Sequence, residues 1–348
     1  MTADDQPRPA SKTAERRLEA PHRRGGASPR IVERVAVAAY RGTSWLLANL
    51  PPKPAATVIG WFSQLSYLAW PTKRGWSNRN FGHVLGLPPD HPRVRTEALR
   101  AYGGYGRYLV ELMRLPSRPS EELVARVPDL DADEVKRIWR EAPNGGGLIL
   151  AVGHVGNNEA VAAAIAHHDM PISVVADDSS FPEIFEILRR QRESWGVKII
   201  AWRNLREIFG VLRRREMLGL LVDWGYRADG IPVRFFGAWT ALPAGPATLA
   251  AKTGSRILPI TIRRQPDDTF HVSFPAPIDV ASSDPAELQR VTQAMADALA
   301  ATIAAAPDQW YSFKPMWPAT AEEAADLERR AGLMQSGVPD PGPAREFA

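Results

Sequence analysis

The chain has 348 residues, of which 45% are hydrophobic and 24% are charged, and its formal net charge is +4. This composition is typical of a folded protein of one or two domains, and the small basic excess suits an anionic membrane surface, an anionic substrate or nucleic acid. Because the chain has no cysteine, disulfide bonds, cysteine-based zinc sites and a cysteine nucleophile are excluded.

The first third of the chain predicts a tail followed by helices. Residues 1–29 are rich in Arg, Pro, Ala, Ser and Gly, and we expect a disordered basic tail there. Two amphipathic helices are predicted over residues 31–50 and 55–70, each ended by proline. They suit either a bilayer interface or packing on each other as a helical layer. No apolar run reaches the roughly eighteen residues of a spanning helix and no signal-peptide pattern is visible, so we expect a protein on the cytoplasmic side.

After further helices at 78–86, 91–114 and 130–142, strand and helix patterns alternate. Strands are predicted at 148–152, 172–176, 198–201 and 218–222, with helices at 159–168, 182–195 and 205–215. Such alternation predicts an α/β fold with a largely parallel sheet flanked by helices. A helix at 246–253, strands at 256–263 and 270–274, and a long helix at 285–305 complete it. We interpret 30–318 as one domain, with membrane-associating helices in 30–115, a catalytic core in 145–318, and a loosely attached tail at 319–348.

A histidine and a carboxylate flank the corner after the first predicted strand. His154 follows the end of that strand, and Glu159 lies five positions on, in the first turn of the next helix. Ligands of open α/β proteins bind at the carboxyl ends of strands, and a histidine held by a carboxylate can take a proton from a hydroxyl. The alternative is a surface histidine beside a carboxylate favoured by the helix dipole. The pair alone leaves both readings open.

A second stretch joins charge to an apolar segment. A predicted strand ends at Asp223, the loop after it carries Arg227, and Phe235 and Phe236 precede Gly237. Small residues around Gly245 then begin a helix, where a phosphate or an acyl chain could approach closely. Ordinary turn chemistry explains each piece equally well.

The sequence motifs of several other kinds of functional site are absent. No Gly-x-Ser-x-Gly elbow follows a strand, and no Gly-x-x-x-x-Gly-Lys-[Ser/Thr] phosphate loop is present. His167 and His168 lie about two helical turns from Glu159, which argues against a shared metal. No dense basic patch with interleaved aromatic residues indicates nucleic-acid binding.

Six blocks in register carry a family resemblance. They are Asn80–Gly86, Tyr105–Glu111, His154-Val-Gly-Asn-Asn-Glu159, Arg192–Gly196, Val233-Arg-Phe-Phe-Gly237 and Pro243-Ala-Gly-Pro-Ala247. Over roughly residues 31–318 the chain resembles the lysophospholipid acyltransferase superfamily. Its closest branch is that of the bacterial lipid A lauroyl/myristoyl acyltransferases, and within it the phosphatidylinositol mannoside acyltransferases.

The resemblance implies transfer of a fatty acyl chain from acyl-CoA or acyl carrier protein to a glycolipid hydroxyl, without a cofactor or metal. His154 would be the general base and Glu159 would orient it, while other residues would bind substrate, namely Arg192, Asp223, Arg227, Phe235, Phe236 and Gly245. The protein would lie peripherally on the inner leaflet of the membrane, with no nucleic-acid partner. Two alternatives stay open: an acyltransferase of ordinary phospholipid synthesis, and a non-catalytic lipid-binding homologue.

Overall fold

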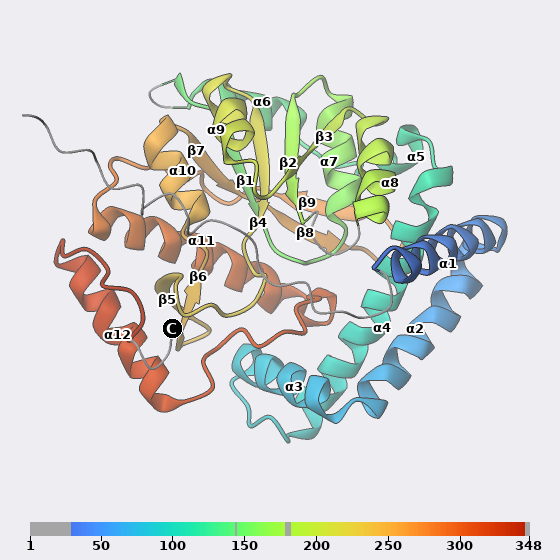
Figure 1. Cartoon of the computed structure of the whole chain (residues 1–348), viewed down its shortest axis with the longest axis horizontal. Helices are drawn as coiled ribbons and strands as arrows, with labels where there is room; N and C mark the ends of the chain where they lie inside the picture. The colour runs from blue at the N-terminus through green and yellow to red at the C-terminus, as the bar shows by residue number, and fades with distance from the viewer. Residues whose placement is uncertain (1–28, 143–144, 178–181, 345–348) are drawn as a thin grey trace, which may run out of the picture.

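The computed structural model describes residues 29–142, 145–177 and 182–344 (Figure 1). Residues 1–28, which hold nearly all of the expected basic tail, lie outside this part of the chain. The N-terminal half of the fold is helical. Its elements are α1 (Pro29–Asn49), α2 (Pro52–Ala69), α3 (Pro71–Leu85), α4 (Pro92–Arg114), η1 (Leu115–Ser117), α5 (Ser120–Val124) and α6 (Ala132–Arg140).

A five-stranded parallel sheet forms the centre of the fold, as the alternating pattern predicted. Its strands lie in the order β3-β2-β4-β1-β7. They are β1 (Leu148–Val152), β2 (Ile172–Ala176), β3 (Val197–Ala201), β4 (Met217–Leu221) and β7 (Arg256–Pro259). The helices that connect and cover them are α7 (Asn158–His167), α8 (Pro182–Glu193), α9 (Leu205–Arg213), α10 (Gly245–Thr253) and α11 (Pro285–Ala305).

Alternate residues of each strand feed two separate apolar cores, because successive side chains point to opposite faces of a sheet. Ile149 and Leu218 belong to the core that contains α9, α10 and α11. Leu148 and Met217 belong to the core that contains α6 and α7. Helices therefore cover both faces, which is why the strands read as continuous apolar runs with little alternation.

The strand order brings the ends of β1 and β4 together. The two strands are parallel neighbours with Val152 opposite Leu221, although the chain visits β2 and β3 between them. The residues two positions beyond each strand are therefore opposite one another as well. Crevices of this kind, at the carboxyl ends of strands where the chain order reverses, are common ligand sites in open α/β sheets.

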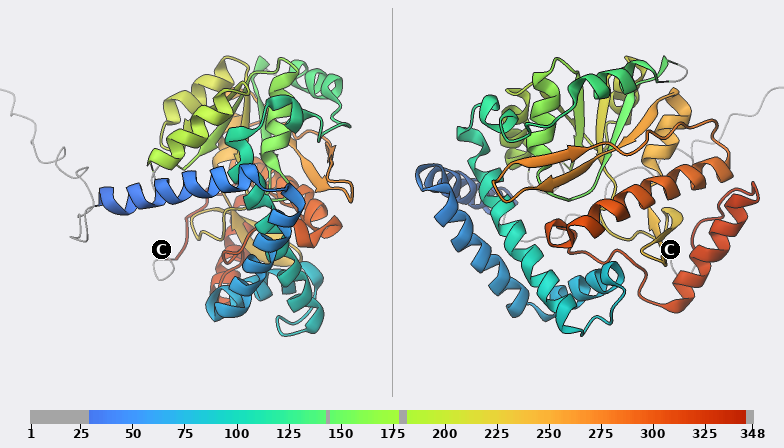
Figure 2. Two further views of the ribbon diagram at one scale, coloured as in Figure 1. Left: turned by 90° about the vertical axis from the view of Figure 1, so that its right-hand side faces the viewer. Right: turned by 180° about the vertical axis from the view of Figure 1, so that it is seen from behind.

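The N-terminal helices form a layer beside this core. α2 runs along α4 through close contacts of small residues: a Cβ on Gly106 would lie 2.8 Å from the Gly60 Cα. α1 and α2 meet at Leu50 and Pro51 and run in different directions (Figure 2). No helix among the described residues is long and apolar enough to cross a bilayer.

Several elements differ from the sequence-based expectation. The stretch after Asp223, expected as a loop and an aromatic segment, forms an antiparallel hairpin of β5 (Ile231–Phe235) and β6 (Ala238–Leu242). The strand expected at 256–263 is two strands, because the chain leaves the sheet after Pro259, whose nitrogen has no hydrogen to donate. β8 (Thr261–Arg264) instead pairs with β9 (Phe270–Ser273).

The C-terminal segment is not loosely attached over its described part. After η3 (Pro307–Gln309), α12 (Ala321–Gln335) begins with a capping box at Thr320 and packs on α11 and the β5–β6 hairpin. Arg330 is fully buried and donates to the backbone oxygens of Ala228 and Gly230 and to the Asp340 carboxylate. This buried polar side chain, together with the buried Leu327 and Met334, thus anchors the helix.

Candidate active site

His154 and Asp223 form the central pair of the site. His154 lies two residues beyond β1 and Asp223 two residues beyond β4, so the register of the two strands places them opposite each other. The His154 Nδ1 lies 2.6 Å from the Asp223 Oδ1, and the His154 backbone N–H also donates to the same carboxylate, 2.9 Å from Oδ2. Both the ring and its backbone are therefore held by one side chain.

The Asp223 carboxylate is fully buried and accepts a further hydrogen bond, from the Trp310 Nε1 at 2.8 Å. Burial raises the pKa of this carboxyl, but His154 and Trp310 more than offset that effect, so that its pKa lies below the ordinary value. An ionised carboxylate can only accept, and the proton between the two side chains therefore belongs on the His154 Nδ1.

The opposite nitrogen of the ring is consequently the basic one. With the proton on Nδ1, the Nε2 carries a lone pair, and a quarter of the side chain is exposed to solvent. Burial lowers the pKa of His154, yet the neighbouring Asp223 charge and hydrogen bond raise it above the ordinary value, against a smaller opposing effect of Lys314. An accessible, basic imidazole nitrogen can take a proton from a hydroxyl.

Glu159 does not hold the imidazole as the spacing predicted. Its carboxylate is bound by both Nε and Nη2 of Arg192, at 2.8 Å and 2.5 Å, and both side chains are largely buried. Glu159 is in the first turn of α7 and Arg192 in the last turn of α8, so this bidentate pair ties two helices together. The structure therefore brings Glu159 and Arg192 together, and gives the ring-orienting position to Asp223.

The turn between His154 and α7 is fixed by asparagines. The Asn157 side chain caps α7 by accepting from the backbone N–H groups of Glu159 and Ala160. Its amide nitrogen donates to Glu111 of α4, and the Asn158 amide donates to the Gly153 oxygen. The Gly-Asn-Asn sequence after His154 thus serves to cap the helix and to lock the strand–helix corner.

Aromatic rings and one lysine surround the site. The Trp224 ring lies 5.7 Å from the His154 ring, and the Lys314 Nζ lies 3.7 Å from the centre of the Trp224 ring. Tyr108 of α4 interacts electrostatically with Glu159 and Arg192, and its ring stacks on Tyr311. Burial raises the pKa of Tyr108 far above the ordinary value, so this hydroxyl is neutral at all ordinary pH values.

The remaining candidate residues lie in three different places. Arg227 is exposed and paired with Asp229 two residues away, so its charge is already balanced within the loop. Phe235 is buried, and it stacks on Trp317 and meets Phe236 edge to face. Gly245 is the first residue of α10.

The residues that the sequence analysis did not single out come from the segment after α11. Trp310 and Lys314 lie about 90 residues beyond Asp223 in the sequence, and no local pattern marks them. The Tyr311 N–H donates to the His154 oxygen, and Val155 and Trp310 form a β-bridge, so this segment braces the histidine. Within the described ranges no three His, Asp or Glu side chains gather as a metal site would need.

Comparison with known proteins identifies the family. The model of the family described as bacterial lipid A biosynthesis acyltransferase matches residues 27–318. A phosphatidylinositol mannoside acyltransferase of Mycolicibacterium smegmatis is 31% identical over 261 residues, which cover 73% of this chain and 82% of that protein. A protein of the same name from Mycobacterium tuberculosis is 30% identical over 260 residues, covering 73% and 80%. The chain is therefore an acyltransferase and belongs to the bacterial lipid A biosynthesis acyltransferase family.

Proposed function

We propose that this acyltransferase moves a fatty acyl chain from a thioester, acyl-CoA or acyl carrier protein, to a hydroxyl of a glycolipid, with His154 as general base. The observation that carries the proposal is the 2.6 Å bond between the His154 Nδ1 and the buried Asp223, which leaves the Nε2 basic and accessible. A glycolipid acceptor is supported by the names of the relatives, which act on phosphatidylinositol mannoside.

The reaction needs no covalent enzyme intermediate. The Nε2 removes the proton of the acceptor hydroxyl as its oxygen attacks the thioester carbonyl, and the imidazolium that forms is stabilised by Asp223. When the tetrahedral intermediate collapses, the carbon–sulfur bond breaks, and the Nε2 proton passes to the leaving thiolate. The products are an ester and a free thiol, and His154 returns to its neutral state.

Glu159 and Arg192 act in this proposal as positioning residues. Their bidentate pair joins the N-terminal end of α7 to the C-terminal end of α8, next to the corner that carries His154. The Phe235 ring stacks on Trp317 and the Phe236 ring meets Trp317 edge to face, and together they supply an apolar wall suited to an acyl chain. Arg227 is the weakest of the expected ligands, because Asp229 already neutralises it.

We further propose that α1 and α2 hold the protein peripherally on the cytoplasmic leaflet. Most large apolar side chains that the described part of the chain exposes lie between residues 35 and 70, namely Val35, Trp45, Leu46, Leu50, Val58, Trp61, Phe62, Leu65, Leu68 and Trp70. Lys73, Arg74 and Arg79 follow directly on α3. Apolar rings beside cations suit the boundary between acyl chains and anionic headgroups.

The test compares two histidine–aspartate pairs of the same chain. His154→Ala is expected to reduce acyl transfer by about 10²–10⁴-fold, the contribution of a general base. At an assay pH above the pKa of His154 the melting temperature should stay near that of the wild type. His271→Ala is the matched control, because His271 of β9 also bonds an aspartate, Asp129, but its side chain is exposed. Equal activity of the His154→Ala and His271→Ala variants would overturn the proposed base.

The acceptor is tested with purified lipids. Labelled palmitoyl-CoA is offered with phosphatidylinositol mannoside, with lysophosphatidic acid or with no lipid, and the products are separated by mass. Transfer to the mannoside supports the proposal. Transfer to lysophosphatidic acid alone would assign the enzyme to ordinary phospholipid synthesis.

A further inference from the structure

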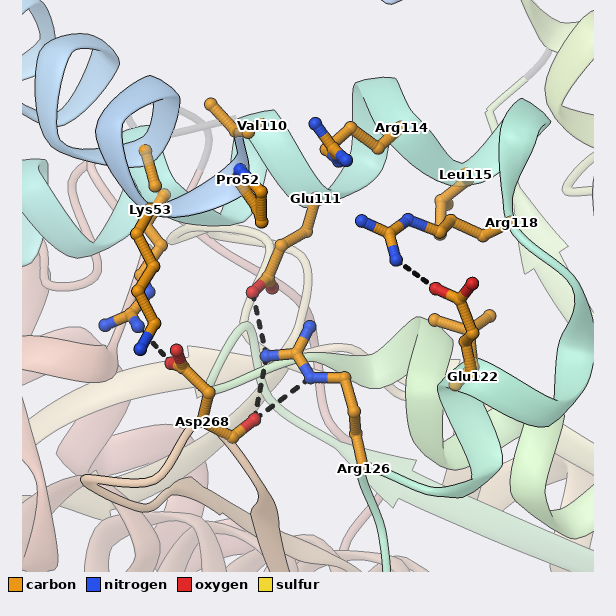
Figure 3. A pocket seen from close by; sticks show the side chains of 13 residues that line it. Pro52, Lys53, Val110, Glu111, Arg114, Leu115, Arg118, Glu122, Arg126 and Asp268 are labelled. Atoms are coloured by element: carbon orange, nitrogen blue, oxygen red, sulfur yellow. Dashed lines mark hydrogen bonds and ion pairs between the residues drawn. The ribbon is translucent and has the colours of Figure 1, made fainter. Parts of the chain in front are cut away.

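A strongly cationic pocket lies beside the C-terminal half of α4. It has a volume of about 230 Å³ and is lined by the start of α2, the C-terminal half of α4, the segment around α5, and Asp268 in the β8–β9 turn. Figure 3 shows Lys53 and Asp268 at one side of this pocket and Arg118 with Glu122 at the other, with Glu111 and Arg126 between them. α4 thus presents Tyr108 toward Glu159 and Arg192, and its basic face to this pocket.

The charges that line the pocket do not balance. Five cationic side chains, Lys53, Arg107, Arg114, Arg118 and Arg126, meet three carboxylates, Glu111, Glu122 and Asp268. Each carboxylate is already engaged. Asp268 pairs with Arg107 and Glu122 with Arg118, while Glu111 is shared between Arg126 and Arg264, the latter at 2.7 Å.

Lys53 and Arg114 are the two cations left over. Neither has a carboxylate partner among the ion pairs of residues 29–142, 145–177 and 182–344. Arg114 is only 8% exposed, and its Nη1 donates to the Leu47 and Leu50 oxygens at the end of α1. Its Nε is buried and has no hydrogen-bond partner within the described part of the chain. A buried, unmatched guanidinium is costly unless an anion joins it.

Two further features favour an anion in the same place. α2 starts at Pro52 without a side-chain cap, and its first residues line the pocket, so the positive end of the helix dipole adds to the side-chain charges. Burial, together with the repulsion of Arg118, lowers the pKa of Arg114 below the ordinary value. A bound anion would relieve both effects by favouring the charged form.

The pocket also adjoins the apolar surface formed by α1 and α2. Pro52, Lys53 and Ala56 line it, while Trp45, Leu46 and Leu50 lie immediately before them and Val58 and Trp61 immediately after, all exposed. A group that enters the pocket from a bilayer on that surface would arrive at headgroup depth. Guanidinium groups match phosphate oxygens in charge and geometry.

We propose that this pocket binds a phosphate mono- or diester group and forms an anion site separate from the acyl-transfer site. The phosphate can belong to a membrane lipid or to a soluble compound, and the chemistry of the pocket is the same for both. Only the lipid source rests on the proposed function, because it requires α1 and α2 to face the membrane. Glu111 links the pocket to the active site, since it bonds Arg126 at one end and the α7 cap Asn157 at the other.

The experiment measures binding of two soluble probes to the full chain by titration calorimetry. The probes are inorganic phosphate and dihexanoyl phosphatidylglycerol below its micelle concentration. Lys53→Ala is expected to weaken binding about fivefold, corresponding to roughly 1 kcal/mol for one lost cation near an anionic group. Lys198→Ala is the matched control. It removes the same charge from the exposed Lys198 of β3, outside the pocket, and should change binding less than twofold.

The outcomes separate the sources of the phosphate. Binding of both probes indicates a general phosphate site, and binding of phosphatidylglycerol alone indicates a lipid headgroup. Binding of neither probe, or an equal loss in the Lys53→Ala and Lys198→Ala variants, would refute the site. The same titration with the His154→Ala variant should match the wild type. Failure of acyl transfer and failure of anion binding are therefore observed independently.

Discussion

The candidate active site and the N-terminal helical layer differ in whether their charged and apolar side chains have partners within the described part of the protein. At the ends of β1 and β4, Asp223 accepts from His154 and Trp310, and Glu159 is fully engaged by Arg192. Along α1 and α2, by contrast, Trp45, Trp61 and Phe62 are among many apolar side chains exposed to solvent. Lys53 and Arg114 beside them have no carboxylate partner in the described ranges.

This difference indicates that the candidate active site is held in place by the protein itself, whereas the apolar surface of α1 and α2 is left exposed. A reacting group must be held before the substrate arrives, because reorganisation during the reaction would cost rate, and the sheet register supplies that rigidity. A surface that contacts a bilayer buries its apolar side chains only when the bilayer is present. Large exposed apolar patches are uncommon on proteins that have no membrane or protein partner. The predictions below test each half of this contrast.

The largest effect is expected in the candidate active site, on substitution of Asp223. Asp223→Asn keeps the size of the side chain but lets an amide N–H face the ring. This places the imidazole proton on Nε2 and removes the lone pair of the proposed base. We expect acyl transfer to fall about 10³–10⁴-fold, as for the loss of the orienting carboxylate in other histidine-based sites. The rate of thiol release from labelled acyl-CoA measures it.

Asp129→Asn provides the control, since Asp129 bonds the exposed His271 in the same way. That variant should retain the wild-type rate. A loss of less than tenfold for Asp223→Asn would mean that the ring keeps its orientation without this carboxylate. That result would contradict the proposal that Asp223 positions His154 as a base before the substrate binds.

The fold class and the position of His154 after a strand could be predicted from the sequence, whereas the hydrogen-bond partner of its ring could not. Apolar runs such as Leu148–Val152 specify strands directly, and His154 follows one of them. Glu159 was preferred as its partner because it is close in the chain. The true partner is 69 positions away, and only the order of the strands places it opposite His154.

Similar reasons explain the other differences. Trp310 and Lys314 come from a segment without regular periodicity, so their places depend on tertiary packing alone. The β5–β6 hairpin turns at Phe236 and Gly237, and Phe236 has a positive φ of 48°, an unusual conformation for an aromatic residue. The sequence does not predict the attachment of α12, which combines the buried Leu327 and Met334 with the buried polar side chain of Arg330.

The next largest effect is expected on membrane binding through the exposed apolar side chains of α2. Replacing Trp61 and Phe62 with serine together should weaken binding to anionic vesicles by about tenfold or more, since each large apolar side chain contributes roughly 1.5–3 kcal/mol when fully buried. Both side chains are exposed, so the melting temperature should change little. Vesicle flotation measures the binding.

Trp202→Ser is the matched change elsewhere, because Trp202 is also exposed but follows β3. Its vesicle binding should equal that of the wild type. If Trp202→Ser and the double variant lose binding to the same degree, the apolar surface of α1 and α2 has no special role at membranes.

A moderate effect is expected within the N-terminal layer, where α2 packs on α4. Alanine normally stabilises a helix relative to glycine, yet a Cβ at Gly106 would come within 2.6 Å of Ser63 and 2.8 Å of the Ile59 oxygen. Gly106→Ala should therefore force α2 away from α4 and reduce the free energy of unfolding by about 1–3 kcal/mol. Chemical denaturation measures it.

Gly75→Ala in α3 is the control for helix propensity, because a Cβ there meets no atom within 4 Å. We expect that variant to gain about 0.5–1 kcal/mol. Opposite signs for the two substitutions would show that α2 is clamped tightly to α4. Equal signs would mean that the layer is loosely attached, and that the pocket at the start of α2 has no fixed shape.

The smallest effect is a shift in the pH dependence of the rate. Asp223 raises the pKa of His154 above its ordinary value of 6.5. Because the proposed base is the neutral His154 ring, kcat/KM should rise with pH through a pKa above 6.5. In the Asp223→Asn variant the residual rate should titrate at a lower pH, since burial and Lys314 both lower the pKa once the carboxylate is gone.

Stability should change in the opposite direction to the rate. A pKa raised in the folded state means that the protonated ring stabilises the fold below the unfolded pKa of about 6.5, and that this contribution disappears as the pH rises through the folded pKa. The enzyme therefore becomes active over the same interval in which the His154–Asp223 ion pair stops contributing to stability. Melting temperatures measured across that interval should converge for the wild type and His154→Ala as the pH rises. A difference independent of pH would place the charge elsewhere than on His154.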